Sequence, residues 1–279
     1  MSESPLNIYD HDRDSAGLRY VYPVVSRRAG GVSIGINLNT NNACNWRCIY
    51  CQVPDLKLGT APPVDLALLE QELNGFLSEL QHGDFMRRVP PEMRRIIDIA
   101  LSGNGEPTSA QEFPEVIELI GRLKPADLKL VLITNGSLMQ RDYVQQGLRR
   151  MAQLNGEVWF KLDRASEAGM LRVNDTKSKM GLVRRNLAMA VSCCPNTWLQ
   201  TCWFALDGKA PSRQEEDDYL EFLAACMQDG IKPSGVLLYG LARPSLQPEA
   251  LQLSVLSVQQ LEPFAARIRA LGLELKLAV

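Results

Sequence analysis

The sequence predicts an α/β fold, a partial (three-quarter) β6/α6 TIM-type barrel with parallel strands. Six short apolar runs recur along the chain, and an amphipathic segment with helical periodicity follows each of them. A strand that returns through a helix pairs in parallel with its neighbour, by a right-handed crossover. Six units are too few to close an eight-stranded barrel. We therefore expect an open barrel, with a doubly wound sheet as the alternative.

The six apolar runs are short and have turn residues nearby, as buried parallel strands do. They cover residues 32–39, 96–102, 129–134, 158–163, 198–206 and 235–241. The final segment L-E-L-K-L-A-V, residues 273–279, predicts one more strand. In either architecture, polar residues at the carboxyl ends of the strands should form the functional site.

Helix boundaries are marked by capping residues. Asp65 is a candidate N-cap for the first helix, and Gly83 is a candidate end. Two later helices are predicted to begin with capping boxes and to end at glycines. One begins with Ser212 and Glu215 and ends at Gly230, and the other begins with Ser257 and Gln260 and ends at Gly272.

Composition narrows the class of protein. The chain has 279 residues with 30 Lys and Arg against 32 Asp and Glu, so a strongly basic nucleic-acid-binding surface is not expected. No run of about 18 apolar residues occurs, and residues 1–14 are too polar for a signal peptide, so we expect a cytoplasmic protein without a membrane span. We expect residues 1–31 to be an N-terminal extension and residues 32–279 to be the barrel.

Seven cysteines in a reducing compartment indicate metal ligands or core thiols rather than disulfides. Cys44, Cys48 and Cys51 follow the first predicted strand, and three thiolates this close together suit one soft metal centre. A four-iron cluster usually takes four cysteines, so three would leave one iron open. A zinc site completed by a distant residue, or buried structural thiols, are the alternatives. The other four cysteines are expected to be small core residues: Cys193, Cys194, Cys202 and Cys226.

Further polar groups end the next strands. In S-G-N-G-E-P-T, residues 102–108, Gly105 permits close backbone approach and Glu106 offers a carboxylate, although a tight turn is the plainer interpretation. Lys161 and Asp163 lie on one face of a strand, as site residues or as a structural ion pair. Weaker candidates, with core packing or loop structure as their plain interpretation, are Gln200, Thr201, Tyr239 and Arg243.

The spacing C-x-x-x-C-x-x-C resembles the cluster motif of the radical S-adenosylmethionine superfamily. G-E-P-T, T-N-G, V-W-F-K-L-D and Y-G-L-A-R-P-S, in this order, resemble the wyosine-synthase-like group of that superfamily. The resemblance implies one 4Fe–4S cluster on Cys44, Cys48 and Cys51, with S-adenosylmethionine on the open iron. The residues implied to contact this cofactor are Tyr50 at the adenine, Gly103, Asn104, Gly105 and Glu106 at the amino group, and Thr134, Asn135, Lys161, Asp163 and Gln200 at the ribose and carboxylate. Asn104 departs from the family pattern, where glycine is common.

The implied reaction begins with an electron from a flavodoxin or ferredoxin. The cofactor is then cleaved to a 5′-deoxyadenosyl radical, which abstracts hydrogen from an unidentified substrate. A transfer-RNA base, a peptide or protein side chain (as for an activase), and a small metabolite all stay open. No catalytic residue is assigned. The rival class is a non-catalytic protein, either an iron–sulfur electron carrier or a zinc-stabilised binding module.

We expect a single cluster and no synthesis of a wyosine precursor. Wyosine synthases carry a second cluster on cysteines upstream of the shared motif, and no cysteine precedes Cys44 in this sequence. Cys193 and Cys194 are adjacent, so on a helix their side chains diverge by roughly 100° and make poor substitutes.

Overall fold

The computed structural model describes residues 17–26 and 30–278, and its centre is one curved, eight-stranded sheet. The strand order is β1-β2-β5-β6-β7-β8-β10-β12, with β1 at one edge and β12 at the other, so the barrel is open. The strands are β1 (Val21–Ser26), β2 (Gly31–Ile36), β5 (Ile96–Leu101), β6 (Lys129–Thr134), β7 (Glu157–Lys161), β8 (Thr197–Cys202), β10 (Gly235–Tyr239) and β12 (Glu274–Ala278).

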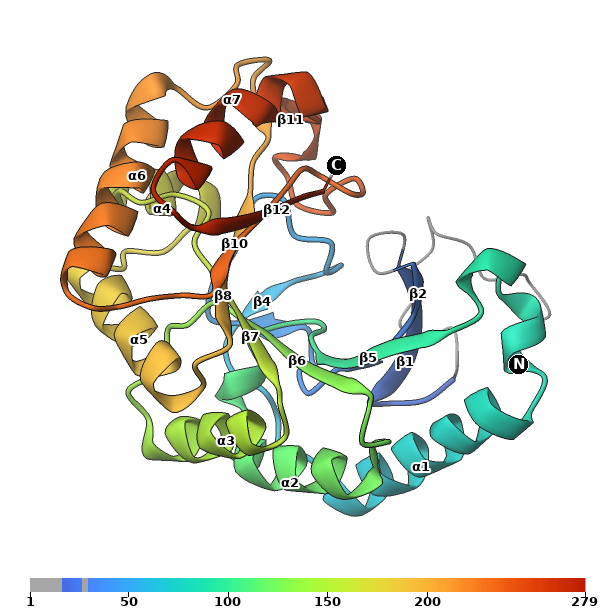
Figure 1. Cartoon of the computed structure of the whole chain (residues 1–279). Helices are drawn as coiled ribbons and strands as arrows, with labels where there is room; N and C mark the ends of the chain where they lie inside the picture. The colour runs from blue at the N-terminus through green and yellow to red at the C-terminus, as the bar shows by residue number, and fades with distance from the viewer. Residues whose placement is uncertain (1–16, 27–29, 279) are drawn as a thin grey trace.

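From β2 to β12 every neighbouring pair of strands is parallel, as the alternation of strands and helices predicted. Figure 1 shows α1, α2, α3, α5, α6 and α7 along the outer, convex side of the sheet. A doubly wound sheet would have helices on both faces. The open barrel is therefore confirmed, and the terminal strand is confirmed as β12.

The helices begin and end largely where the capping residues indicated. Asp65 accepts a hydrogen bond from the Leu68 amide at the start of α1, and both predicted capping boxes are present at the starts of α6 and α7. Gly230 and Gly272 follow those two helices with positive φ. The helices are α1 (Leu66–His82), α2 (Phe113–Leu123), α3 (Asp142–Gln153), α4 (Glu167–Asn174), α5 (Met180–Cys193), α6 (Arg213–Gln228) and α7 (Val258–Arg269).

Successive side chains of each strand point to opposite faces of the sheet. Outward-facing side chains such as Ile34 and Leu132 are fully buried, in one hydrophobic core with helix residues such as Leu73. Strand residues of the other parity are often polar: Lys129 Nζ lies 2.7 Å from Glu157 Oε1. The concave side of the sheet is therefore lined by hydrogen bonds and ion pairs as well as by apolar groups.

Three features were not predicted. Strand β1 pairs antiparallel with β2. Just before β1, the Glu72 carboxylate of α1 accepts hydrogen bonds from the backbone amides of Arg19 and Tyr20, each at 2.8 Å. The predicted run at residues 198–206 is wrong as one strand, because it divides into β8 and the two-residue β9 (Ala205–Leu206), which pairs with β11 (Leu253–Ser254). Helix α4 was not predicted at all.

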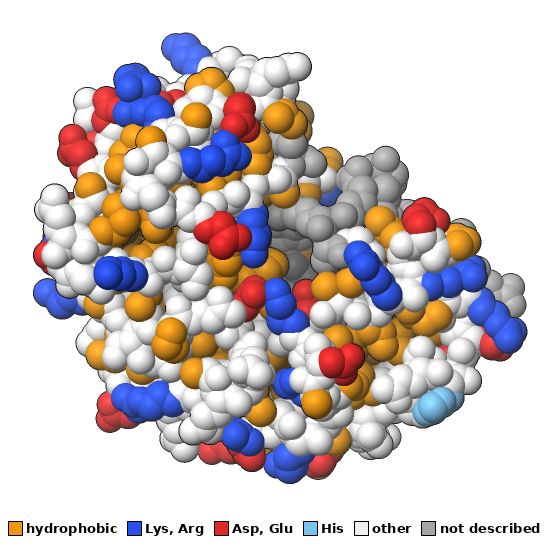
Figure 2. Space-filling model, viewed as in Figure 1, with side chains coloured by type: hydrophobic (Ala, Val, Ile, Leu, Met, Phe, Trp, Pro, Cys, Tyr) orange, Lys and Arg blue, Asp and Glu red, His pale blue; other side chains and the backbone are white. Residues whose placement is uncertain are grey.

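Among the described residues, no helix is long and apolar enough to cross a membrane. Lys, Arg, Asp and Glu side chains are interspersed on the face seen in Figure 2, without a large patch of one sign. His82 is the last residue of α1, whereas His11 lies outside the described residues.

Candidate functional site

The three clustered cysteines lie on the long loop between β2 and α1. Cys44 ends the short strand β3 (Ala43–Cys44), which pairs with β4 (Lys57–Leu58), and the Cys51 amide donates to the Cys48 carbonyl at 2.9 Å. All three thiols are partly exposed. Burial raises the pKa of Cys44 and of Cys48 to about 12. These two groups are therefore protonated thiols at neutral pH unless a cation stabilises the thiolates.

Helix α4 holds one side of this cysteine loop. The amides of Arg47 and Ile49 donate to the carbonyls of Asn174 and Val173, at 3.2 and 2.9 Å. The final carbonyls of a helix lack partners within the helix, so the loop satisfies them. Because the loop supplies hydrogen-bond donors and the end of α4 supplies acceptors, α4 and the cysteine loop stabilise one another.

A segment after β10 holds the other side of the loop. The Ser245 hydroxyl donates to the Ile49 carbonyl at 2.8 Å, and the Leu246 amide donates to the Cys51 carbonyl at 2.9 Å. The Gln247 side-chain amide donates to the Val53 carbonyl at 2.9 Å. Residues nearly 200 positions later in the chain thus fix the backbone around the last two cysteines.

Arg47 connects the two sides. Its guanidinium donates to both carboxylate oxygens of Glu249, at 2.9 and 3.0 Å, and its Nε donates to Asp175 at 2.9 Å. Both acceptors raise the pKa of Arg47 further above its ordinary value. This forked contact secures the loop between Cys44 and Cys48.

We expect Arg47→Ala to speed amide hydrogen exchange in residues 44–53 and to lower the free energy of unfolding by about 1 kcal/mol, since it removes a forked but partly exposed ion pair. Mass-spectrometric hydrogen exchange and urea unfolding would measure the two effects. Arg150→Ala is the matched control, because Arg150 makes a similar fork to Glu118 on helices away from the loop. Equal exchange of residues 44–53 in both variants would contradict this role for Arg47.

The loop after β5 approaches the cysteine loop through two glycines. Gly103 has φ +148° and packs on Asn37, whose side-chain oxygen accepts from the Asn104 amide at 3.0 Å. A Cβ at Gly105 would lie 2.0 Å from the Ala43 carbonyl oxygen. Asn104 donates to the Asn42 side chain at 2.6 Å, while its own side-chain oxygen is buried and has no partner among the described residues. This loop is therefore more than a turn, because it forms a close contact with the cysteine loop.

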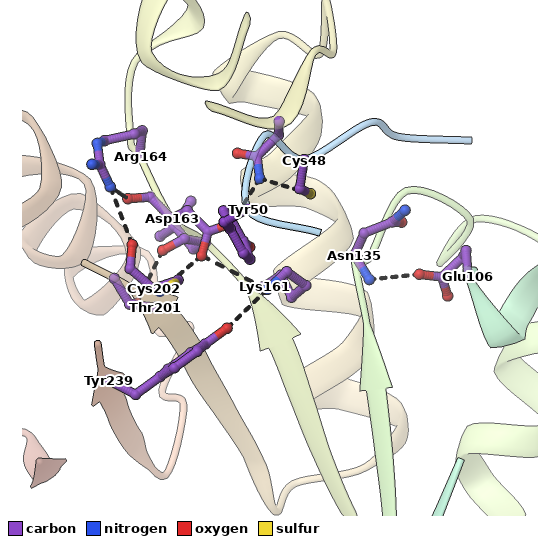
Figure 3. A network of polar contacts seen from close by, with 12 residues as sticks. Cys48, Tyr50, Glu106, Asn135, Lys161, Asp163, Arg164, Thr201, Cys202 and Tyr239 are labelled. Atoms are coloured by element: carbon purple, nitrogen blue, oxygen red, sulfur yellow. Dashed lines mark hydrogen bonds and ion pairs between the residues drawn. The ribbon is translucent and has the colours of Figure 1, made fainter. Parts of the chain in front are cut away.

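Glu106 joins the β5 and β6 loops. It is 2% exposed and accepts four hydrogen bonds, from the amide and hydroxyl of Thr108, the Thr134 hydroxyl and the Asn135 amide, at 2.5–3.1 Å. Burial raises the pKa of Glu106, and these donors oppose the shift. The contact with Asn135 is drawn in Figure 3. Three of these bonds go to Oε1 and one goes to Oε2, so the Glu106 carboxylate fixes the β5 loop to the β6 loop.

The β6 loop also reaches the cysteine loop. The Asn135 side-chain amide donates to the Asn45 side-chain oxygen at 2.7 Å. The Asn45 side-chain nitrogen in turn donates to the Ser137 hydroxyl at 2.7 Å. The cysteine loop and the loops after β5 and β6 are therefore joined by asparagine side chains.

The end of β7 carries a polar network, shown in Figure 3. Asp163 accepts from the Tyr50 hydroxyl at 2.5 Å and from the Cys202 amide at 2.8 Å, and lies 3.8 Å from Lys161 Nζ. Lys161 donates to the Tyr239 hydroxyl at 3.2 Å. Burial lowers the pKa of Lys161, but attraction to Asp163 and its other neighbours raises it well above its ordinary value, so the ammonium stays charged. Tyr50 and Tyr239 thus belong to one network with the predicted pair.

The two candidates on β8 differ. Gln200 pairs in register with Lys161, and its buried side-chain oxygen has no hydrogen-bond partner in the described part of the chain. Thr201 faces the other way, toward α6, and exchanges a hydrogen bond with the Tyr219 hydroxyl at 2.6 Å. Thr201 therefore has the packing role that was its plain interpretation. The four remaining cysteines are buried, as expected of core thiols.

Sequence reasoning missed the asparagines that connect the loops, including Asn37, Asn45 and Asn174. One signal was present in N-L-N-T-N-N-A-C-N, residues 37–45, which places five asparagines around the first cysteine. Asparagine offers two donors and an acceptor without charge, so such a cluster suits loops that must bond to one another.

Comparison with solved structures identifies the architecture. The structure of TYW1, a wyosine synthase, with a lysine–pyruvate adduct bound superposes with a TM-score of 0.53 at 14% identity, over 87% of this chain and 74% of the other. A spore photoproduct lyase mutant gives 0.51 at 11% identity, over 82% and 70%. The chain has the fold of the radical S-adenosylmethionine enzymes. The cysteine loop follows β2 and bonds to the loops after β5 and β6 and to the end of β7, so it lies at the carboxyl ends of the parallel strands.

Sequence comparison adds curated relatives that match part of this chain. A UPF0026 protein of Helicobacter pylori (strain J99) is 31% identical over 160 residues, which is 56% of this chain and 46% of the relative. The chain therefore spans about half the length of the curated relatives it matches. No family model matches the chain.

Proposed function

We propose that this protein is a radical S-adenosylmethionine enzyme with one 4Fe–4S cluster held by Cys44, Cys48 and Cys51. The observation that carries the proposal is that the loop with the three clustered cysteines is joined by side-chain hydrogen bonds to the β5 and β6 loops and to the end of β7. A purely structural thiol cluster would not need this polar framework.

The donor set fits an iron–sulfur cluster better than a single zinc ion. Among the described residues, no three Cys, His, Asp or Glu side chains are arranged to hold one metal ion. A zinc ion needs all its thiolates about 2.3 Å from one centre. A cluster contains several irons, so its thiolates bind separate atoms and stand further apart.

Two groups are available to a cofactor beside the cluster. The buried side-chain oxygens of Asn104 and Gln200 have no partner among the described residues, and a buried unpaired acceptor is costly unless a ligand donates to it. We assign the cofactor's ammonium to the loop of Gly103–Gly105 and its carboxylate to the Lys161 ammonium, while Tyr50 and Gln200 border its nucleoside. Thr134, Asn135, Glu106 and Asp163 position these groups through the bonds described above.

When bound, the cluster and S-adenosylmethionine supply reductive cleavage of the cofactor to a 5′-deoxyadenosyl radical, which takes hydrogen from the substrate. The chain's own residues bind and orient the cofactor and exclude water. The electron donor is of flavodoxin or ferredoxin type, and we place the protein in the cytoplasm, where its cysteines stay reduced. A small molecule, a protein side chain and a transfer-RNA base all stay open as substrates.

The proposed cofactor site is tested by binding of S-adenosylmethionine to anaerobically reconstituted protein. Lys161→Met should weaken binding at least tenfold with unchanged iron content, because it removes the charge opposite the carboxylate and leaves the thiols intact. Isothermal calorimetry and iron analysis measure the two quantities. Lys276→Met, on the edge strand β12, is the control. Wild-type affinity in Lys161→Met would contradict the assignment of Lys161.

A further inference from the structure

Asn174 places a hydrogen-bond donor on one of the three cysteine sulfurs. It is the last residue of α4 and 1% exposed. Its side-chain nitrogen Nδ2 lies 3.2 Å from Cys48 Sγ and 2.7 Å from Asp163 Oδ2. One amide group therefore contacts both the cysteine loop and the polar network at the end of β7.

The surroundings hold this amide in place. The Asn174 carbonyl accepts from the Arg47 amide, and α4 itself is capped at its start by Ser166. Asp163 is fixed in turn by the Cys202 amide and the Tyr50 hydroxyl. Turning the Asn174 side chain away from Cys48 would break its bond to a buried carboxylate, which is costly. The N–H group is thus directed at the sulfur by structure that exists without any metal.

A donor at this position has a defined electronic effect. The reduction potential of an iron–sulfur cluster depends on its hydrogen bonds to sulfur, its net charge and its exposure to solvent. Adding one electron makes the cluster more negative without making or breaking a bond. An N–H group near a ligand sulfur stabilises that extra charge, and so raises the potential.

We propose that Asn174 is a positioning residue that raises the reduction potential of the cluster through its hydrogen bond to Cys48. This inference rests on the proposed function, because it requires the cluster. Helix α4, which belongs to no sequence motif, would thus influence how readily an external electron donor reduces the cluster.

The experiment is a potentiometric titration of reconstituted full-length protein, followed by electron paramagnetic resonance of the reduced cluster. Asn174→Leu removes the donor at similar volume, and Asn174→Ala removes it without adding a branched side chain. We expect the potential to fall below the wild-type value in both variants. For Asn174→Leu, at a fixed potential, the ratio of reduced to oxidised cluster should fall about tenfold, which is about 59 mV for one electron.

Thr201→Val is the matched control, because it also deletes a buried hydrogen bond of the barrel but faces α6, away from Cys48. It should keep the wild-type potential. Unchanged potentials in both Asn174 variants at wild-type iron content, or an equal shift in Thr201→Val, would overturn the inference while leaving the proposed function intact. If the wild type binds no cluster, the proposed function itself fails.

A measurement on the wild type covers the case in which the Asn174 variants do not fold. Labelling asparagine side chains with ¹⁵N should give a nuclear coupling to the reduced cluster in pulsed electron paramagnetic resonance, through the N–H···S contact. Absence of any such coupling would overturn the inference without a variant.

Discussion

Replacing Cys44, Cys48 or Cys51 by Ala should abolish the iron–sulfur absorbance of reconstituted protein. Each thiolate is proposed to hold a separate iron, and no spare thiol lies on the same loop. We expect iron to fall from about four atoms per chain to below one in each variant. Colorimetric iron and sulfide assays, with absorbance spectra, measure this loss.

Cys226→Ala is the control for these variants. Cys226 is a buried thiol on α6, so its loss should leave the cluster intact and cost little stability. Full iron content in all three loop variants would contradict the assignment of the ligands. About eight irons per chain in the wild type would instead contradict the expectation of one cluster.

Gly105→Ala should be the most damaging substitution outside the cysteines. A Cβ at this position would lie 2.0 Å from the backbone oxygen of Ala43 and 2.6 Å from the side-chain nitrogen of Asn39. The Ala43 oxygen is backbone and the Asn39 side chain is held by hydrogen bonds, so the β5 loop must move away from the cysteine loop. We expect a loss of about 3 kcal/mol in the free energy of unfolding, and loss of S-adenosylmethionine binding in any folded protein.

Gly75→Ala separates this steric effect from the general effect of replacing glycine. Gly75 lies within α1, and a Cβ there meets nothing within 4 Å. Since alanine favours helix more than glycine does, this variant should gain up to about 1 kcal/mol. Chemical unfolding of both variants gives the comparison. If Gly105→Ala is as stable as wild type, the close contact between the two loops does not exist.

Much of the fold was predictable because its signals are local and repeated. The apolar run of β6 and the capping boxes at Ser212 and Ser257 needed only neighbouring residues to be recognised. Strand β1 was missed because its place depends on distant groups, including the Glu72 carboxylate that binds the backbone just before it. Helix α4 has only eight residues and is completed by the cysteine loop, so its own sequence gives little helical periodicity.

The residues of the candidate site likewise include some that the sequence indicates and some that only the structure reveals. The three cysteines and Gly105 carry information in their spacing, and the structure places them on loops that meet. Asn45 and Asn174 act through hydrogen bonds to residues 90 and 126 positions away, so no short motif contains both partners. The bonds of Glu106 to Thr134 and Asn135 likewise join residues 28 and 29 positions apart, so the motif around Glu106 does not contain these partners.

The most direct test of the proposed function is formation of 5′-deoxyadenosine by reduced, anaerobically reconstituted protein. With S-adenosylmethionine and dithionite, the wild type should release 5′-deoxyadenosine and methionine even without its substrate, and Cys48→Ala should release neither. Chromatography with mass detection measures both products. A wild-type protein that carries a full, reducible cluster and binds the cofactor, yet forms no 5′-deoxyadenosine above the Cys48→Ala background, would contradict the account.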